Sequence, residues 1–180
     1  QFAGTAIADF LFGDYNPAGR LPVTFYKSDN DLPSFTDYSM SNRTYRYFKG
    51  EPLYGFGYGL SYTTFEYSNL IVNTEMQNSQ GNVEVSVEVT KTGNGQGDEG
   101  GQLYVKDVES SVTTYESQLR GFERISLQPG EKKTVKFILH PDDLAILDKN
   151  MNWTVEPGQF EIRIASSSTE IKLKKSLTIK

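Results

Sequence analysis

The clearest pattern in the chain begins near residue 67, where apolar and polar side chains alternate with a period of two. The alternation recurs in five runs, at residues 83–89, 103–105, 135–139, 160–164 and 171–179. Turn residues separate the runs, as at Pro129-Gly130 and Pro157-Gly158. Short alternating strands with this spacing are typical of an antiparallel sandwich in which each sheet buries one face. Residues 67–180 are therefore predicted to form an immunoglobulin-like β-sandwich of about seven strands.

The pattern before residue 28 is of another kind. Residues 3–12 place their apolar side chains on one stripe of a helix, and Gly13 suits the left-handed position just past a helix end. Residues 14–19 have turn chemistry and residues 20–25 read as extended. A lone amphipathic helix and one strand cannot bury enough surface to fold alone. Residues 1–27 are therefore predicted to be the C-terminal remnant of an α/β domain whose body lies outside this chain.

Residues 28–66 show no clear period, yet they are not polar. Aromatic residues are 13% of the chain, and they crowd between positions 45 and 67. A solvated flexible linker would be poor in Tyr and Phe. We expect an aromatic-rich linker that lies along the surface of another domain.

Composition excludes several classes of function. The net charge is −5 and the cations are scattered, so we expect no nucleic-acid partner. No apolar run approaches the ~18 residues of a membrane span, which predicts no membrane partner. The chain has no Cys and a single His, His140. That inventory argues against a metal site, a Ser-His-Asp triad or a bound cofactor.

Three stretches carry a resemblance to a known family. Residues 4–22, which include LFGDYNPAGRLP, resemble the end of the α/β-sandwich domain of family 3 glycoside hydrolases. Residues 43–65, which end in FGYGLSYTTF, resemble the segment that follows it. The motifs QLYV, LRGFER, LQPGE and WTVEPG between residues 102 and 158 resemble the fibronectin type III-like domain of the same enzymes. Gly55 departs from the family, which usually has Pro there, and this widens backbone freedom.

The resemblance implies a retaining β-glucosidase or β-xylosidase, whose mechanism needs two carboxyl groups about 5–5.5 Å apart. In the family the nucleophile is an Asp on an N-terminal barrel, and the acid/base is usually a Glu on the α/β domain. Both precede the stretch that matches residue 1, so no catalytic residue is expected in this chain. The implied partners are those two domains, and the implied location is periplasmic or secreted.

Two alternatives to a domain-bracing role stay open. The sandwich could be a carbohydrate-binding accessory module that contacts oligo- or polysaccharide. It could also be a free-standing adhesion-like domain, although such a domain would not need the ordered motifs before residue 67. Exposed, coplanar aromatic side chains on one sheet would favour the carbohydrate-binding module.

Candidate contact residues lie in the aromatic stretch. Arg43, Tyr45 and Tyr47 are the candidates for the rim of a glycan subsite, because aromatic faces stack on sugar C–H surfaces and guanidinium groups donate to hydroxyls. The competing interpretation, which we favour, is that these rings anchor the segment to neighbouring domains. Trp153, the single Trp, is expected to be at least partly buried in the sandwich.

Two other patterns are interpreted as structural. Neighbouring carboxylates such as Asp98 and Glu99 fall in predicted turns or strand ends, where we expect them to be solvated or to cap backbone groups. Residues 95–100 fit G-x-G-x-x-G, but a strand pattern rather than a helix follows. We therefore expect a hairpin loop and not a dinucleotide site.

Overall fold

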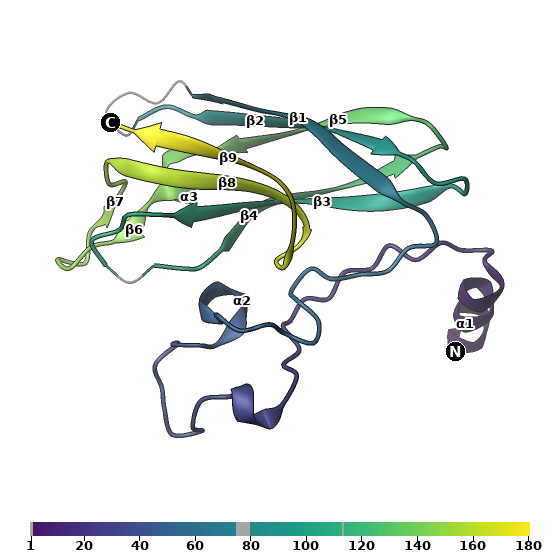
Figure 1. Ribbon diagram of the computed structural model, residues 1–180, viewed down its shortest axis with the longest axis horizontal. Coiled ribbons are helices and arrows are strands. Elements are labelled where there is room, and N and C mark those ends of the chain that lie inside the picture. Colours follow the sequence, from purple (N-terminus) through teal and green to yellow (C-terminus); the bar gives the residue numbers. More distant parts are fainter. Residues whose placement is uncertain (1, 75–79, 113) are drawn as a thin grey trace.

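Two antiparallel sheets packed face to face make up most of the molecule (Figure 1). The computed structural model describes residues 2–74, 80–112 and 114–180. Within these ranges one sheet has the strand order β1-β2-β5 and the other has β4-β3-β8-β9, so β1, β5, β4 and β9 are the outermost strands. The strands are β1 Phe65–Thr74, β2 Val83–Lys91, β3 Gly97–Asp107, β4 Gln118–Leu127, β5 Lys132–Leu139, β8 Gly158–Ser167 and β9 Glu170–Ile179. The predicted antiparallel sandwich of about seven strands is confirmed.

The core lies between the two sheets, where the period-two pattern places it. The four valines of β2 at positions 83, 85, 87 and 89 are each at most 1% exposed. Leu103, Ile162 and Ile164 from the other sheet are fully buried in the same cluster. Burial of each such side chain contributes about 1.5–3 kcal/mol. This alternation therefore fixes which face of each strand is turned inward.

A short appendage projects from one end of the sandwich. It consists of α3 (Pro141–Leu144) and a two-stranded hairpin of β6 (Ile146–Leu147) and β7 (Trp153–Thr154). The expectation that Trp153 is at least partly buried is wrong, because its side chain is 72% exposed. The reason is its position on β7, which pairs only with β6 and does not enter the sandwich core.

The glycine-rich run after β2 is not a hairpin loop, which corrects the prediction. β2 pairs with β1 and β5, whereas β3 pairs with β4 and β8, so residues 92–96 cross from one sheet to the other. The fully buried Lys91 organises this crossing. Its Nζ donates to Thr63 Oγ1 at 2.7 Å, to Gly93 O at 3.1 Å and to Gly95 O. A buried ammonium needs such acceptors, so the loop folds around it.

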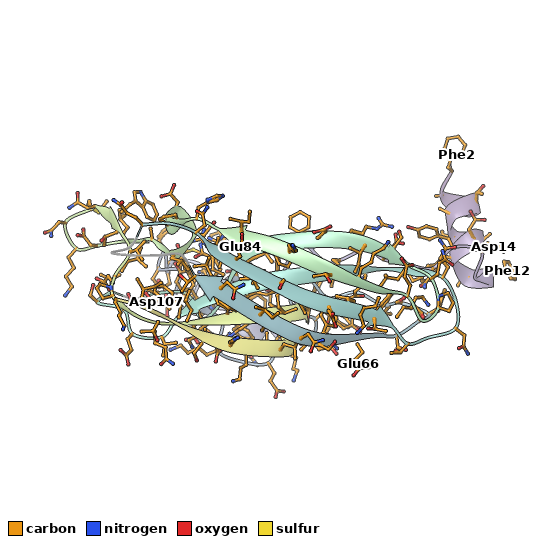
Figure 2. All side chains as sticks on the ribbon, turned by 90° about the horizontal axis from the view of Figure 1, so that it is seen from above. Phe2, Phe12, Asp14, Glu66, Glu84 and Asp107 are labelled. Atoms are coloured by element: carbon orange, nitrogen blue, oxygen red, sulfur yellow. The ribbon has the colours of Figure 1, made fainter. Side chains whose placement is uncertain are left out.

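The opening helix α1 (Ala3–Phe12) stands away from the sandwich (Figures 1 and 2). It ends, as predicted, at Gly13, which has a left-handed φ of 82°. None of its residues is buried. Phe2 and Phe12 lie at its two ends and are 79% and 84% exposed (Figure 2). The helix therefore has an apolar surface that the sandwich does not cover.

The segment between α1 and β1 is irregular, with two short helices, η1 (Asp29–Asp31) and α2 (Thr44–Tyr47). The extended stretch expected at residues 20–25 contains one isolated antiparallel bridge, between Phe25 and Tyr54, rather than a full strand. Leu21 N donates to Tyr58 O at 2.8 Å, and Leu21 O accepts from Gly57 N at 2.7 Å. The beginning and the end of the segment thus run side by side beneath the sandwich (Figure 1).

Candidate interdomain site

Tyr45 attaches α2 to the outer face of the four-stranded sheet. Its ring stacks on Phe56 with centroids 4.2 Å apart and planes at 15°. It also meets the edge of Tyr104 at 6.0 Å, and its hydroxyl accepts a hydrogen bond from Leu119 N at 3.3 Å. Each aromatic pair contributes about 0.5–1.5 kcal/mol beyond its buried area. Tyr45 is therefore half-buried in contacts with this chain's own sandwich.

Tyr47 lies at the other side of α2, against the loop that precedes β4. Its ring centroid is 5.2 Å from that of Tyr115, at an angle of 58°. The Arg46 guanidinium sits 5.2 Å from the centre of the same Tyr115 ring. Burial, together with the neighbouring Tyr115 hydroxyl, raises the pKa of Tyr47. The Tyr47 hydroxyl thus remains neutral, next to the Arg46 guanidinium that lies over the Tyr115 ring.

Arg43 is directed away from these rings. Its Nη2 donates to the carbonyl oxygens of Asp37 at 2.8 Å and Ser34 at 3.1 Å, and its Nε donates to Ser39 O at 3.3 Å. These contacts close the loop of residues 34–39. Of the three sequence-predicted rim residues, the structure brings Tyr45 and Tyr47 to the sandwich and leaves Arg43 within its own loop.

The buried amide of Gln102 joins the aromatic segment to the sandwich. Its Nε2 donates to Gly57 O at 3.1 Å and to Ser166 O at 2.7 Å, and its Oε1 accepts from the Tyr104 hydroxyl at 2.5 Å. Gly57 has a φ of +79°, and a Cβ there would lie 2.1 Å from Gln102 Oε1. Both the backbone conformation and the close approach require glycine at this position.

A second buried link joins the N-terminal segment to the core. Glu99 is 4% exposed and accepts from Arg20 Nη2 at 3.0 Å and from the Tyr67 hydroxyl at 2.7 Å. Burial raises the pKa of Tyr67, and the Glu99 carboxylate adds to the effect, so Tyr67 stays a neutral donor. The expectation that Glu99 is solvated is wrong, because Arg20 reaches this inward-facing position from the preceding segment.

The sequence contained a signal for this link that the strand-end interpretation overlooked. Glu99 has the same odd-numbered phase on β3 as Leu103 and Val105, which both lie in the core. A carboxylate in the inward phase of an alternating strand needs a buried partner. Gln102 and Tyr104 have the outward phase and are nevertheless buried, because the aromatic segment covers that face.

α1 is attached to the remainder of the chain by a few polar contacts. The Tyr62 hydroxyl donates to Phe10 O at 2.8 Å, and the two rings lie 5.7 Å apart. Just after the helix, Asn16 Nδ2 donates to Gln96 O at 3.0 Å, and Asn16 Oδ1 accepts from Tyr62 N at 2.9 Å. On the free side of the helix, Ile7 is 58% exposed and Leu11 is 68% exposed.

Metal-binding clusters and membrane-spanning helices are absent from the described residues. These residues include no group of three or more His, Asp or Glu that could hold a metal ion. None of their helices is both long and apolar enough to cross a membrane. Glu99 is the one buried carboxylate in the described ranges, and each of its two oxygens accepts a hydrogen bond, from Arg20 and from Tyr67.

Comparisons with known sequences match two parts of the chain to family models. Residues 1–62 match the sequence model of the glycosyl hydrolase family 3 C-terminal domain, and residues 99–168 match that of the fibronectin type III-like domain. A periplasmic beta-glucosidase of Salmonella typhimurium is 42% identical over 95% of this chain. A xylan 1,4-beta-xylosidase of Xylanibacter ruminicola is 46% identical over 99% of it. The chain spans 24% and 20% of the lengths of these two relatives.

The fold agrees with solved structures as well. Beta-glucosidase 3B from Thermotoga neapolitana, in complex with alpha-D-glucose, superposes with a TM-score of 0.89 and 35% sequence identity. The match covers 99% of this chain and 27% of that one. The order of the two matched domains, the identity to the relatives and the shared fold lead to one conclusion. The chain belongs to the family 3 glycoside hydrolases and corresponds to their C-terminal and fibronectin type III-like regions.

Proposed function

We propose that this chain braces the catalytic domains of a larger retaining β-glycosidase and hydrolyses nothing alone. In this proposal residues 1–27 complete an α/β domain, residues 28–66 are the connecting segment and residues 67–180 are the bracing sandwich. The parent would release terminal β-linked glucose or xylose from oligosaccharides, as the names of the relatives suggest. One relative is named as periplasmic, which supports a periplasmic or secreted location for the parent.

The observation that carries the proposal is the uncovered apolar surface before β1. Ile7 and Leu11 of α1 are more than half exposed, and Phe35 and Tyr38 are 96% and 94% exposed. Isolated exposed apolar residues are ordinary, but α1 has no buried residue, and the contact of Phe10 with Tyr62 leaves most of its apolar surface in water. The chain spans 24% and 20% of the lengths of the two relatives. This supports the remainder of the parent protein as the partner that covers this surface.

The bracing role is tested by reassembly. The 180-residue chain is co-expressed with the preceding portion of its parent polypeptide, and both co-purification and turnover of an aryl β-glucoside and an aryl β-xyloside are measured. We expect activity from the pair and none from the chain alone. Leu11→Asp should abolish co-purification while the circular dichroism of the sandwich stays unchanged.

Ile138→Asp is the matched control. Ile138 is 55% exposed on β5 of the three-stranded sheet, which lies on the opposite side of the sandwich from the aromatic segment (Figure 1). The same apolar-to-acid change there should leave reassembly intact. Turnover by the isolated chain, or equal loss of reassembly with both variants, would contradict the proposal.

A further inference from the structure

A cleft of about 520 Å³ opens where α2, the strand β4 and the β6–β7 hairpin meet. This volume lies within the range of about 300–1,000 Å³ that small-ligand sites occupy. The residues on which the argument depends are three aromatic and three polar, namely Tyr47, Tyr115, Trp153, Gln118, Arg120 and Asp142. The cleft is distinct from the α1 surface, and it is assembled from both the aromatic segment and the sandwich.

Trp153 is the main apolar feature of the cleft. At 72% exposure it leaves most of a large aromatic surface in water on a two-residue strand. The other rings are fixed in place, since Tyr47 packs on Tyr115 at 5.2 Å and Arg46 lies over Tyr115. An amphipathic ring held at the mouth of a cleft offers a flat face to an apolar surface of similar width. The C–H face of a pyranose ring is such a surface.

Arg120 provides the polar part of the site. Among the described residues its buried Nε has no hydrogen-bond partner, and its Nη1 is 3.8 Å from Asp143 Oδ1, which is too long for a strong ion pair. Burial lowers the pKa of Arg120, which reflects a guanidinium that is poorly solvated. Such a group gains more from a new acceptor than an exposed one does. Its side chain retains 19% exposure, in the wall of the cleft.

The polar residues of the cleft suit a neutral ligand with both donors and acceptors. Arg120 donates, the exposed Asp142 accepts, and the Gln118 amide can do either. Charges of both signs surround the cleft, with Arg120 and Arg46 on one side of the balance and Asp142 and Asp143 on the other, so the site does not select an ion of one sign. Vicinal hydroxyl groups on a ring with an apolar face match this combination.

We propose that this cleft is a saccharide-binding subsite, in which Trp153 stacks on a pyranose unit and Arg120 and Asp142 bind its hydroxyls. The inference goes beyond the bracing role and does not depend on reassembly. Only the choice of β-linked xylose and glucose chains as probes rests on the proposed function. Binding here would hold a longer substrate chain on the parent enzyme.

The experiment uses the fluorescence of Trp153, which is the only Trp in the chain. The 180-residue chain is titrated with xylohexaose and with cellohexaose, and calorimetry provides the stoichiometry. We expect a saturable emission change with one of the two sugars, one site per chain and a Kd in the range of about 0.1–10 mM, since one ring and a few hydrogen bonds provide modest affinity. The sugar that binds identifies the substrate chain.

Variants decide whether this cleft is responsible. Trp153→Ala and Arg120→Gln should each weaken the calorimetric affinity by roughly tenfold or more, as loss of a central contact does. Phe122→Ala removes a ring that is 75% exposed but does not line the cleft, and it should leave the affinity unchanged. No heat with either sugar at 10-fold excess over about 1 mM chain, or an unchanged affinity in Trp153→Ala, would overturn the proposal. Protection of Trp153 from acrylamide quenching by the preceding domains, without sugar, would also overturn it, because the cleft would then be a protein contact.

Discussion

Replacement of Glu99 by Ala is expected to destabilise the sandwich and to loosen the segment that precedes it. The substitution removes one carboxylate that accepts from Arg20 at 3.0 Å and from Tyr67 at 2.7 Å. It leaves a guanidinium that is 17% exposed and a buried phenol without their acceptor. Loss of one partner of a buried pair costs about 3–5 kcal/mol. Because Arg20 retains some access to water, we expect a loss of about 3 kcal/mol in the free energy of unfolding.

The assay is denaturant unfolding followed by far-ultraviolet circular dichroism, because Trp153 is too exposed to report burial of the core. Asp98→Ala is the matched control on the next residue of β3. Asp98 forms an ion pair with Arg124, whose side chain is 56% exposed, so its removal should cost about 1 kcal/mol or less. In addition, limited proteolysis should cut within residues 14–62 faster in Glu99→Ala than in Asp98→Ala. Equal and small losses for the two variants would refute the argument that Glu99 carries the link.

Three further predictions concern a turn, the core and pH. Gly57→Ala should lower the free energy of unfolding by about 3 kcal/mol, because it strains the backbone and displaces the buried Gln102 amide. Gly130 has a similar φ of +75° but open space around it, so Gly130→Ala should lower that free energy by about 1 kcal/mol. Comparable denaturation midpoints for the two variants would contradict this prediction. Phe137→Ala should lower the free energy of unfolding by about 3 kcal/mol, because Phe137 packs on the core. Lys136 is adjacent but exposed, so Lys136→Ala should lower it by under about 0.5 kcal/mol in the same denaturation assay. Burial, opposed by a hydrogen bond from a backbone N–H and assisted by nearby carboxylates, raises the pKa of Asp107. Since a raised pKa means that ionisation disfavours the folded state, Asp107→Asn should raise stability at pH 7, and thermal unfolding should show that gain disappear below about pH 4.

Much of the sandwich could be predicted because its strands follow one local rule. Alternation identified the inward valines of β2, and Gly13 identified the end of α1. Trp153 was harder to place, because a Trp in an extended segment fits a core strand and a projecting hairpin equally well. Its location depends on which strand pairs with β7, and pairing between strands is a non-local property.

The candidate site was predictable only in part, for a related reason. Tyr45 and Tyr47 were selected because aromatic residues in an irregular segment need something to contact, and the structure places them against this chain's own residues, whereas their role at a glycan rim stays a prediction. Arg43 was grouped with them by proximity in sequence, but its donors are taken up by carbonyl groups four to nine residues earlier. The inward phase of Glu99 on β3 indicated that its carboxylate is buried, but no local pattern could identify its partner Arg20, which lies 79 residues away in the sequence.

The four outermost strands of the sandwich bear on how this protein behaves at high concentration. Open edges can pair with the edges of other copies and lead to aggregation, and charged side chains or irregular backbone hinder such pairing. Lysines occupy two of the edges, at positions 132, 133 and 136 of β5 and 172, 174 and 175 of β9. β4 carries Arg120 and Arg124, and β1 has an irregularity between Ser68 and Ile71. Each outer edge of the two sheets therefore carries a feature that hinders growth into fibres, which favours separate copies of this chain in a crowded solution.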